Sequence, residues 1–555
     1  MAEPTDRKKL LQRWGELKQE RASWVPHWQE ISDHLLPRSG RFFVQDHNRG
    51  EKRYNKINDS TGTKALRTLS AGMMSNMTSP ARPWFRLSTS DPKLDEADEI
   101  KQWLADVQQI MNMVFNKSNT YRALHSMYEE LGAYGTAGAI VLPDFNNVIH
   151  IHTLTAGEYA IGTNHQGVVD TLYREFEMTV SQMVKEFGLD KCSTTVQNAY
   201  ERGALEKWVT VMHCIEPRDA RDTTKLDAVN MAFKSIYFEP GAQDGQFLRE
   251  SGFKRFPALC PRWSVSGGDI YGNSPGMEVL GDIKQLQHEQ MRKAQGIDYL
   301  TKPPLQAPPN MKGREIDMLP GGISFVEQST GGGIKTAFEA RIDLGHLLND
   351  IQDVRSRIQG GFFADMFLMM ANDTRSGITA TEVAERHEEK MLMLGPVVER
   401  LHNEILSPLI DMAFDRMVEA GIVPPPPQDI AGMELNVEFV SVLAQAQRAV
   451  ATNSVDRFIG NLGAVAQYKP EVLDKLDADK WADEYADMLG VNPNILVPAD
   501  KVAQIRMQRQ QAQQAAQQAA QADQMASAAQ KLGSVQTPTG NAASDVMQGL
   551  TGYTT

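Results

Sequence analysis

Two helical patterns that flank a segment rich in proline and glycine constrain the fold of this chain more than any other feature. Apolar residues recur at helical spacing from Gly276 to Leu300, and again from Asp343 to Gly361. Between them, residues 303–342 hold five prolines and a run of three glycines, which interrupt helices. Structureless loops of this length are uncommon in compact domains. The pattern therefore predicts two long helices that carry a small folded tip, with an ordinary helix–loop–helix insertion as the alternative.

The first 270 residues combine helical and strand patterns. Apolar residues recur at helical spacing in the stretches 10–35, 66–77 and 103–115. Runs typical of strands follow at 148–154, 168–176, 208–215 and 231–238. Asp59 and Ser60 can cap the second helical stretch, and Thr179 with Gln182 forms a capping box for a helix that Gly188 can close. We therefore expect an α+β fold that is predominantly helical.

The remainder of the chain is expected to be mostly helical. A Met-rich apolar stretch leads into a polar turn over 369–377, after which Thr379 and Glu382 open a long helix. The run Pro424–Pro427 predicts a rigid linker and a domain boundary, followed by a short helical domain. From Gln504 to Gln530, 20 of 27 residues are Ala or Gln. This composition favours a helix without an apolar stripe wide enough to bury alone, and a solvated or disordered tail is the alternative.

Charge and cysteine content exclude several classes of protein. The chain has 57 Lys and Arg against 70 Asp and Glu, a net charge of −13, which is unlike a basic protein that coats nucleic acid. Its three cysteines have no close spacing, which argues against a disulfide scaffold and a thiolate-rich zinc site. Neither a secretory leader nor an apolar run of about 18 residues is found, so we expect no membrane insertion.

The motifs for enzymatic chemistry are incomplete. Around Lys335, the two positions at which a phosphate-binding loop needs glycine are Ser329 and Ile334. The pairs His288–Glu289 and His387–Glu388 lack the second histidine of a zinc-protease motif. His213 and Cys214 are neighbours in an expected strand and would point to opposite faces. We therefore predict no catalytic, cofactor-binding or metal site.

Six short segments matter through their order and spacing. They are Leu36–Arg38 with Gly40–Phe42, Leu69–Gly72, Thr78–Phe85, Gly135–Thr136, Tyr271–Gly276 and Thr379–Val383. Over residues 5–420 this arrangement resembles the head-to-tail connector, or portal, proteins of short-tailed bacteriophages. The resemblance implies a ring of twelve subunits, each with a wing, a two-helix stem, a clip, a crown and a C-terminal helical barrel.

The resemblance also implies boundaries for these parts. The expected parts are the wing (1–270 and 362–423, the latter with a channel loop at 369–377 and a long helix), the two stem helices (271–302 and 343–361), the clip (303–342), the crown (424–497), the barrel helix (498–531) and a flexible tail (532–555). In a ring, about twelve Ala/Gln helices can bury their narrow faces against one another.

The function that the resemblance implies is structural. The ring would occupy the unique capsid vertex of the virion, after assembly in the host cytoplasm, and would need no cofactor. Double-stranded DNA would enter through it, driven by a separate packaging ATPase, the terminase, and would later leave through it. The other expected partners are a tail adaptor and the major capsid and scaffolding proteins. The alternatives are a nucleic-acid-processing enzyme of the packaging apparatus, and a tail adaptor or tube ring, which predicts a mostly β chain.

The charge of such a ring suits a passage for DNA. Twelve copies would carry a net charge of −156, and an acidic lumen repels phosphates, so DNA can slide without being held. A few residues would then contact DNA without regard to its sequence. The candidates are Met369, Met370, Asn372, Thr374 and Arg375 in the loop, and Lys284, Arg292, Lys293, Arg355 and Arg357 on the stem. The alternative for each basic residue is a solvated or salt-bridged surface.

Overall fold

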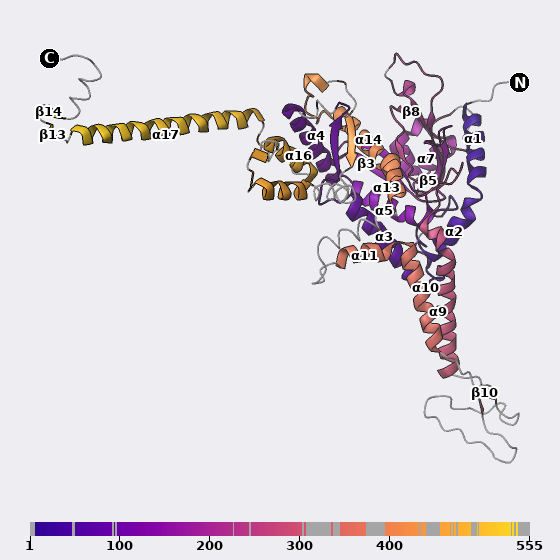
Figure 1. The fold of residues 1–555 in the computed structure, drawn as a ribbon. Helices are drawn as coiled ribbons and strands as arrows, with labels where there is room; N and C mark the ends of the chain where they lie inside the picture. The colour runs from indigo at the N-terminus through magenta and orange to yellow at the C-terminus, as the bar shows by residue number, and fades with distance from the viewer. Residues whose placement is uncertain are drawn as a thin grey trace.

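The structure is a computed structural model in which a mixed α and β body carries two projections (Figure 1). A pair of long helices extends downward from the body, and a single long helix extends sideways near the C-terminus. The α+β fold is confirmed, with more helix than strand. The structure describes residues 6–46, 50–91, 94, 97–225, 227–242, 246–301, 305–306, 335–336, 344–372, 394–430, 432, 435–439, 455–466, 468–469, 471–472, 476–489, 497, 499–533, 536–537 and 540–541.

Most of the helices lie in the body. The first seven are α1 (Asp6–Arg21), α2 (Trp24–His34), α3 (Thr61–Met77), α4 (Asp98–Lys117), α5 (Thr120–Tyr134), α6 (Val180–Phe187) and α7 (Thr194–Glu201). The middle of the chain forms α8 (Pro275–Glu278), α9 (Leu280–Thr301), α10 (Leu344–Gly361) and α11 (Ala364–Asn372). Then come α13 (Gly395–Leu401), a π-helical turn η5 (His402–Leu406), α14 (Ser407–Glu419), α16 (Ala478–Leu489) and α17 (Ala499–Gly533).

The two largest sheets of the described chain are antiparallel and lie in the body. The larger has the strand order β4 (Tyr159–Thr163), β5 (Val169–Thr179), β6 (Trp208–Pro217), β7 (Phe233–Phe238) and β8 (Arg249–Phe253). The smaller has the order β3 (Val148–Leu154), β2 (Gly138–Asp144) and β9 (Ala258–Leu259). All four predicted strand runs are confirmed, with ends that differ by at most three residues.

The capping signals are confirmed in large part. Thr179 accepts a hydrogen bond from the backbone N–H of Gln182, and the Gln182 side chain accepts one from the backbone N–H of Thr179. Gly188 follows the last residue of α6, as predicted. At the start of α3, Asp59 accepts hydrogen bonds from Thr61, whereas the Ser60 side chain makes no capping bond. The prediction for Ser60 was therefore wrong.

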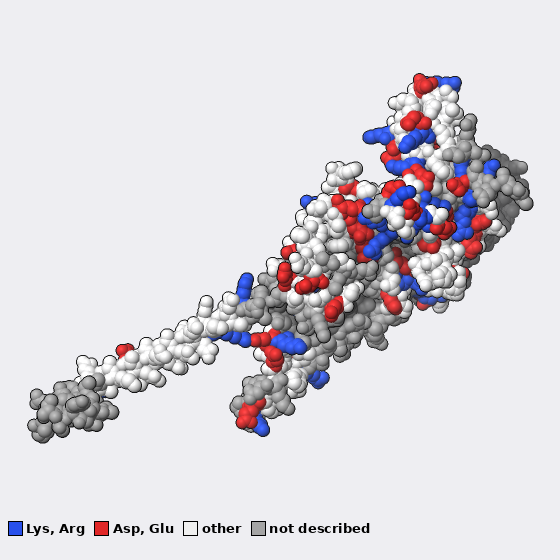
Figure 2. All heavy atoms as spheres, turned by 90° about the horizontal axis from the view of Figure 1, so that it is seen from above, with Lys and Arg blue, Asp and Glu red and all other residues white. Residues whose placement is uncertain are grey.

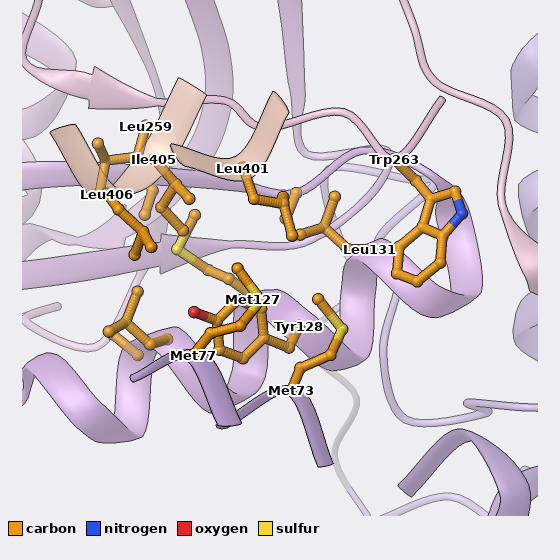
Figure 3. Close-up of a cluster of buried hydrophobic side chains, with 14 of the residues drawn as sticks. Met73, Met77, Met127, Tyr128, Leu131, Leu259, Trp263, Leu401, Ile405 and Leu406 are labelled. Atoms are coloured by element: carbon orange, nitrogen blue, oxygen red, sulfur yellow. The ribbon is translucent and has the colours of Figure 1, made fainter. Parts of the chain in front are cut away.

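The core of the body lies between α3, α5 and the segment 394–417 (Figure 3). Met73 and Met77 from α3 face Met127, Tyr128 and Leu131 from α5, and Leu401, Ile405 and Leu406 approach from the other side. Burial of such side chains stabilises a fold by roughly 1.5–3 kcal/mol each. The projections therefore extend from a well-packed base.

The chain does not leave the body at Pro424–Pro427. Trp103 Nε1 donates a 3.0 Å hydrogen bond to the carbonyl oxygen of Pro424, and Ile430 is buried in the core. Strand β12 (Leu435–Phe439) then pairs antiparallel with β1 (Phe85–Thr89). The described residues up to Phe439 thus belong structurally to the body.

Several expected features lie partly outside the described residues. In the expected tip, β10 (Leu305–Gln306) pairs with β11 (Lys335–Thr336), and the other residues of 303–342 lie outside. In the expected crown, residues 455–466 and α16 are helical, and 440–454 lie outside. Within the expected tail, β13 (Gln536–Thr537) and β14 (Gly540–Asn541) form a small hairpin.

Candidate functional site

The projecting pair α9 and α10 is packed near the body and uncovered farther out. Near the body, Ile283 and Leu286 of α9 and Ile351, Val354 and Ile358 of α10 are buried. In the distal half, apolar side chains are 40–48% exposed: Met291, Ile297, Tyr299, Leu300 and Leu348. At 22 residues, α9 is about 33 Å long, so its distal half stands clear of the body. We refer to α9 and α10 together as the stem.

A single carboxylate, Asp59, joins the base of the stem to α3. Its side chain accepts hydrogen bonds from Arg355 Nη2 of α10 at 2.7 Å and from Gln290 Nε2 of α9 at 2.9 Å. It also accepts one from the backbone N–H of Thr61 at 2.9 Å. Burial alone would raise the pKa of Asp59, but the hydrogen bonds from Thr61 and Arg355 outweigh burial and lower it below its ordinary value. Asp59 is therefore ionised at neutral pH.

Three of the five basic stem candidates form ion pairs within the chain. Lys284 lies 2.5 Å from Glu30, and Arg355 is paired with Asp59. Arg357 lies 3.5 Å from Asp282 and 3.6 Å from Asp353. A cation that already faces a carboxylate offers less charge to a phosphate. The salt-bridged alternative thus describes these three residues in the single chain.

The other two basic stem candidates, Arg292 and Lys293, are held less strongly by interactions within the chain. Arg292 Nε donates a 3.3 Å hydrogen bond to His288 Nε2, one turn earlier in α9. Arg292 is exposed, whereas Lys293 is only partly exposed. Both belong to the distal half of the stem. They are the stem candidates with the most charge available to an outside partner.

The candidate loop 369–377 begins inside a helix. Met369, Met370 and Asn372 belong to α11, while Thr374 and Arg375 lie outside the described residues. Helix α11 packs on α3, and a Cβ atom at Gly72 of α3 would lie only 2.3 Å from the Phe367 ring. The described helix therefore includes the first part of the expected loop, as far as Asn372.

A buried serine–histidine pair in the large sheet cannot act as a nucleophile and base. His213 Nε2 lies 3.0 Å from Ser235 Oγ, and Arg174 Nε donates to His213 Nδ1 over 3.3 Å. Because Nδ1 accepts this bond, the neutral ring carries its proton on Nε2 and donates it to Ser235. Burial, with Arg174 nearby, holds the pKa of His213 well below its usual range. Cys214 packs on the opposite face of the sheet, as the alternation predicted.

Helix α5 contains a buried glutamate that the sequence analysis did not single out. Glu130 of α5 accepts hydrogen bonds from the hydroxyls of Ser39 and Thr155 and from the backbone N–H of Ala156. Burial raises its pKa to about 7, and these hydrogen bonds oppose the rise. In the sequence, the adjacent acidic residues Glu129 and Glu130 are typical of a solvated helix face. The sequence therefore gave no indication that Glu130 is buried.

Charged side chains are unevenly distributed over the molecule. Figure 2 shows basic and acidic side chains intermixed over the body, whereas the arm formed by α17 is largely uncharged.

In the part of the chain that the structure describes, His, Cys, Asp and Glu side chains form no group of three or more that could hold a metal ion. None of the helices described combines the length and the apolar character needed to cross a membrane.

Comparisons with known proteins define the class to which this fold belongs. The sequence model of the family described as "Bacteriophage head to tail connecting protein" matches residues 7–496, so the chain belongs to that family. It is 66% identical, over the full length of both chains, to the "Probable portal protein" of Bordetella phage BPP-1. It is 45% identical to the "Portal protein" of Salmonella phage epsilon15 over 97% of each chain. The predicted portal, or head-to-tail connector, function is confirmed.

Proposed function

We propose that twelve copies of this chain form a closed ring at one vertex of the capsid, and that double-stranded DNA enters and leaves through its central channel. Membership of the connector family, with relatives that match along the whole chain, is the observation that carries this proposal. The ring would be part of the virion, assembled in the host cytoplasm. It would have no enzymatic role of its own.

The uncovered half of the stem supports a ring. Successive residues of a helix are separated by 100°, so Met291, Ile297, Tyr299 and Leu300 lie on different sides of α9. Helix α10 covers only one of these sides. A ring built from heterologous contacts places a neighbouring copy on each flank of every stem, and the exposed apolar side chains would then be covered.

Helix α17 supports the same conclusion from a second part of the chain. None of its described side chains is buried, and Ile505, Met507 and Met525 are exposed. With 35 residues the helix is about 50 Å long. Its alanines allow close approach of a neighbouring helix, and its glutamines line the exposed sides without charge. A barrel of such helices would extend the channel with a neutral lining.

We propose a division of the subunit that takes the limits of the stem and barrel from α9, α10 and α17 and makes two further adjustments. We assign the wing to 1–270 and 362–439, the stem to α9 and α10, the clip to 303–342, the crown to 440–497 and the barrel to α17. The first adjustment follows from the pairing of β12 with β1, which keeps 424–439 in the wing. The second follows from α11, so the loop that would narrow the channel begins at residue 373 and includes Thr374 and Arg375.

The lining of the channel would bind DNA weakly. The net charge of −13 per copy, with Lys284, Arg355 and Arg357 already paired, leaves few cations for phosphates. Arg292, Lys293 and Arg375 are the proposed non-specific contacts. The proposed partners are the terminase ATPase, a tail adaptor, and the major capsid and scaffolding proteins. A mostly β tail-tube ring is disfavoured by the predominance of helix.

Complementation of a phage that lacks this chain tests the proposal. Heads assembled without the chain should hold no nuclease-protected DNA, and supplying the chain in trans should restore it. The purified chain with magnesium and ATP should show no turnover, because the ATPase is a separate protein. DNA-filled heads without the chain would contradict the proposed passage, and stoichiometric ATP turnover would favour a packaging enzyme.

A further inference from the structure

The contact between the stem and α3 involves the backbone as well as side chains. Gln287 of α9 is buried, and its side-chain oxygen accepts hydrogen bonds from the backbone N–H groups of Asn58 at 2.6 Å and Asp59 at 2.7 Å. Its Nε2 donates to the carbonyl oxygen of Asp59 at 3.0 Å. The residues that precede α3 are therefore fixed to α9 in one register.

The Asp59 side chain adds the second stem helix to this junction. This one carboxylate connects three helices. It accepts hydrogen bonds from Arg355 of α10 and Gln290 of α9, and a capping bond from Thr61 of α3. The Asp59 side chain is only 7% exposed, and that of Arg355 is 37% exposed. A buried carboxylate that loses one partner pays the desolvation penalty in full, so the arrangement favours a single geometry.

Helix α11 depends on two supports that this junction holds together. It follows α10 directly, through the buried Phe362 and through Phe363, which adopts a positive φ of 55°. It also packs on α3, where the Phe367 ring lies against the backbone of Gly72 so closely that no side chain could fit. Movement of α10 relative to α3 would therefore strain α11, because one support would shift and the other would stay.

We infer that Asp59 is the positioning residue that keeps α3 and α10 in register, so that a displacement of the stem is passed on to α11. In a ring of the kind proposed above, α11 leads into the segment expected to narrow the channel, and only this consequence rests on the proposed function. The junction itself is a property of the single chain. It provides a mechanical link between the projecting stem and a helix at the base of the body.

Two arginines of α10 provide a matched pair of variants. Arg355 contacts Asp59, whereas Arg357 contacts Asp282 and Asp353, which belong to the stem itself. Arg355→Gln and Arg357→Gln remove the same charge from the same helix. Amide hydrogen exchange followed by mass spectrometry reports on α11 in the purified full-length chain, without DNA or capsid. The outcome is thus independent of whether the chain packages DNA.

We expect Arg355→Gln to raise exchange about fivefold in α11 and in the first turn of α3, the factor that corresponds to about 1 kcal/mol. Arg357→Gln should leave both segments unchanged. Gly72→Ala should raise exchange in α11 and leave the first turn of α3 unchanged, because it displaces Phe367 without touching Asp59. Asp59→Asn should reproduce the effect of Arg355→Gln.

Two results would overturn the inference. In the first, Arg355→Gln changes exchange only in α10 or α3, and α11 keeps its protection. In the second, Arg357→Gln loosens α11 as much as Arg355→Gln does, which would make the effect a general consequence of stem charge. If Asp59→Asn does not fold, the two arginine variants decide the question alone, since Arg355 is partly exposed and its loss leaves the core intact.

Discussion

Helices α3 and α17 show two different ways in which this sequence specifies a helix. Nine of the 17 residues of α3 are buried, among them Leu66, Leu69 and Met73. Of the described side chains in the 35-residue helix α17, none is buried. The first helix is stabilised by tertiary packing and the second by the intrinsic propensity of alanine and glutamine. The chain therefore completes α3 by itself, whereas α17 would be completed by other copies in the proposed ring.

From this difference we expect that substitutions in the core lower the stability of the single chain. Substitutions in α17 should instead change how copies of the chain associate. Leu69→Ala should lower the free energy of unfolding by roughly 2–5 kcal/mol, because it leaves a cavity between α3 and α5. Gln517→Ala in α17 is the control and should leave the unfolding of the body unchanged. Denaturant unfolding measures both. A loss below about 1 kcal/mol for Leu69→Ala would show that the core repacks around the cavity.

The buried Glu130 should make the stability of the body depend on pH in an unusual direction. Its pKa rises from 4.5 to about 7 on folding, so the folded chain retains a proton that the unfolded chain releases. The contribution of this group is therefore complete below pH 4.5 and is lost as the pH rises to about 7, at a slope of up to about 1.4 kcal/mol per pH unit.

Glu130→Gln removes this titration and keeps the side-chain shape. The difference in unfolding free energy between the natural chain and the variant should change between pH 4.5 and 7 and should be constant above that range. Denaturant unfolding at a series of pH values measures the difference. A difference that does not vary with pH would mean that Glu130 is ionised in the folded body.

Helix α17 should respond to substitutions that leave the body unaffected. Replacing Ala516 and Ala520 with glycine should destabilise the helix by about 1 kcal/mol per residue. Circular dichroism of the dispersed chain should show a loss of helix, and the main unfolding transition should stay in place. If the main transition shifts as well, α17 packs on its own body in solution and the contrast with α3 fails.

The smallest effect is expected at the base of α17. Arg506 forms a two-pronged ion pair with Asp479 of α16, with distances of 2.5 and 2.6 Å, and both side chains are largely exposed. Exposed pairs contribute little stability, so Arg506→Gln should not change unfolding. It should instead broaden the range of angles between α17 and α16, which small-angle X-ray scattering detects as a changed maximum dimension. An unchanged scattering profile would show that other contacts set this angle.

Features with local signals could be predicted from the sequence. The capping box at Thr179, the stem helices and the Ala/Gln helix each depend on residues a few positions apart, and all three are observed. Helix α5 was not predicted: its polar stripe of Arg122, His125, Ser126 and Glu129 is narrow, because ten of its 15 residues are buried. The pairing of β12 with β1 joins residues far apart in the chain, so no local sequence pattern could predict it.

The site was less predictable than the fold for the same reason. Whether a basic stem residue is paired depends on partners distant in sequence: Arg355 and Asp59 are 296 positions apart, and Lys284 and Glu30 are 254 apart. The sequence identified Asp59 as a helix cap, which is its local role. Its contact with both stem helices arises only from the tertiary structure. Gly72, noted only as part of a short segment, is explained by the close approach of Phe367.

Single-particle electron microscopy of the purified full-length chain tests most directly the claim that neighbouring copies cover the exposed stem and α17. We expect closed rings of about twelve copies with a central opening. In these rings Met291, Ile297 and Leu300 of each stem contact the next subunit, and the α17 helices lie side by side. Single chains at high concentration, or closed rings in which the distal stems and α17 remain separated by solvent, would contradict it.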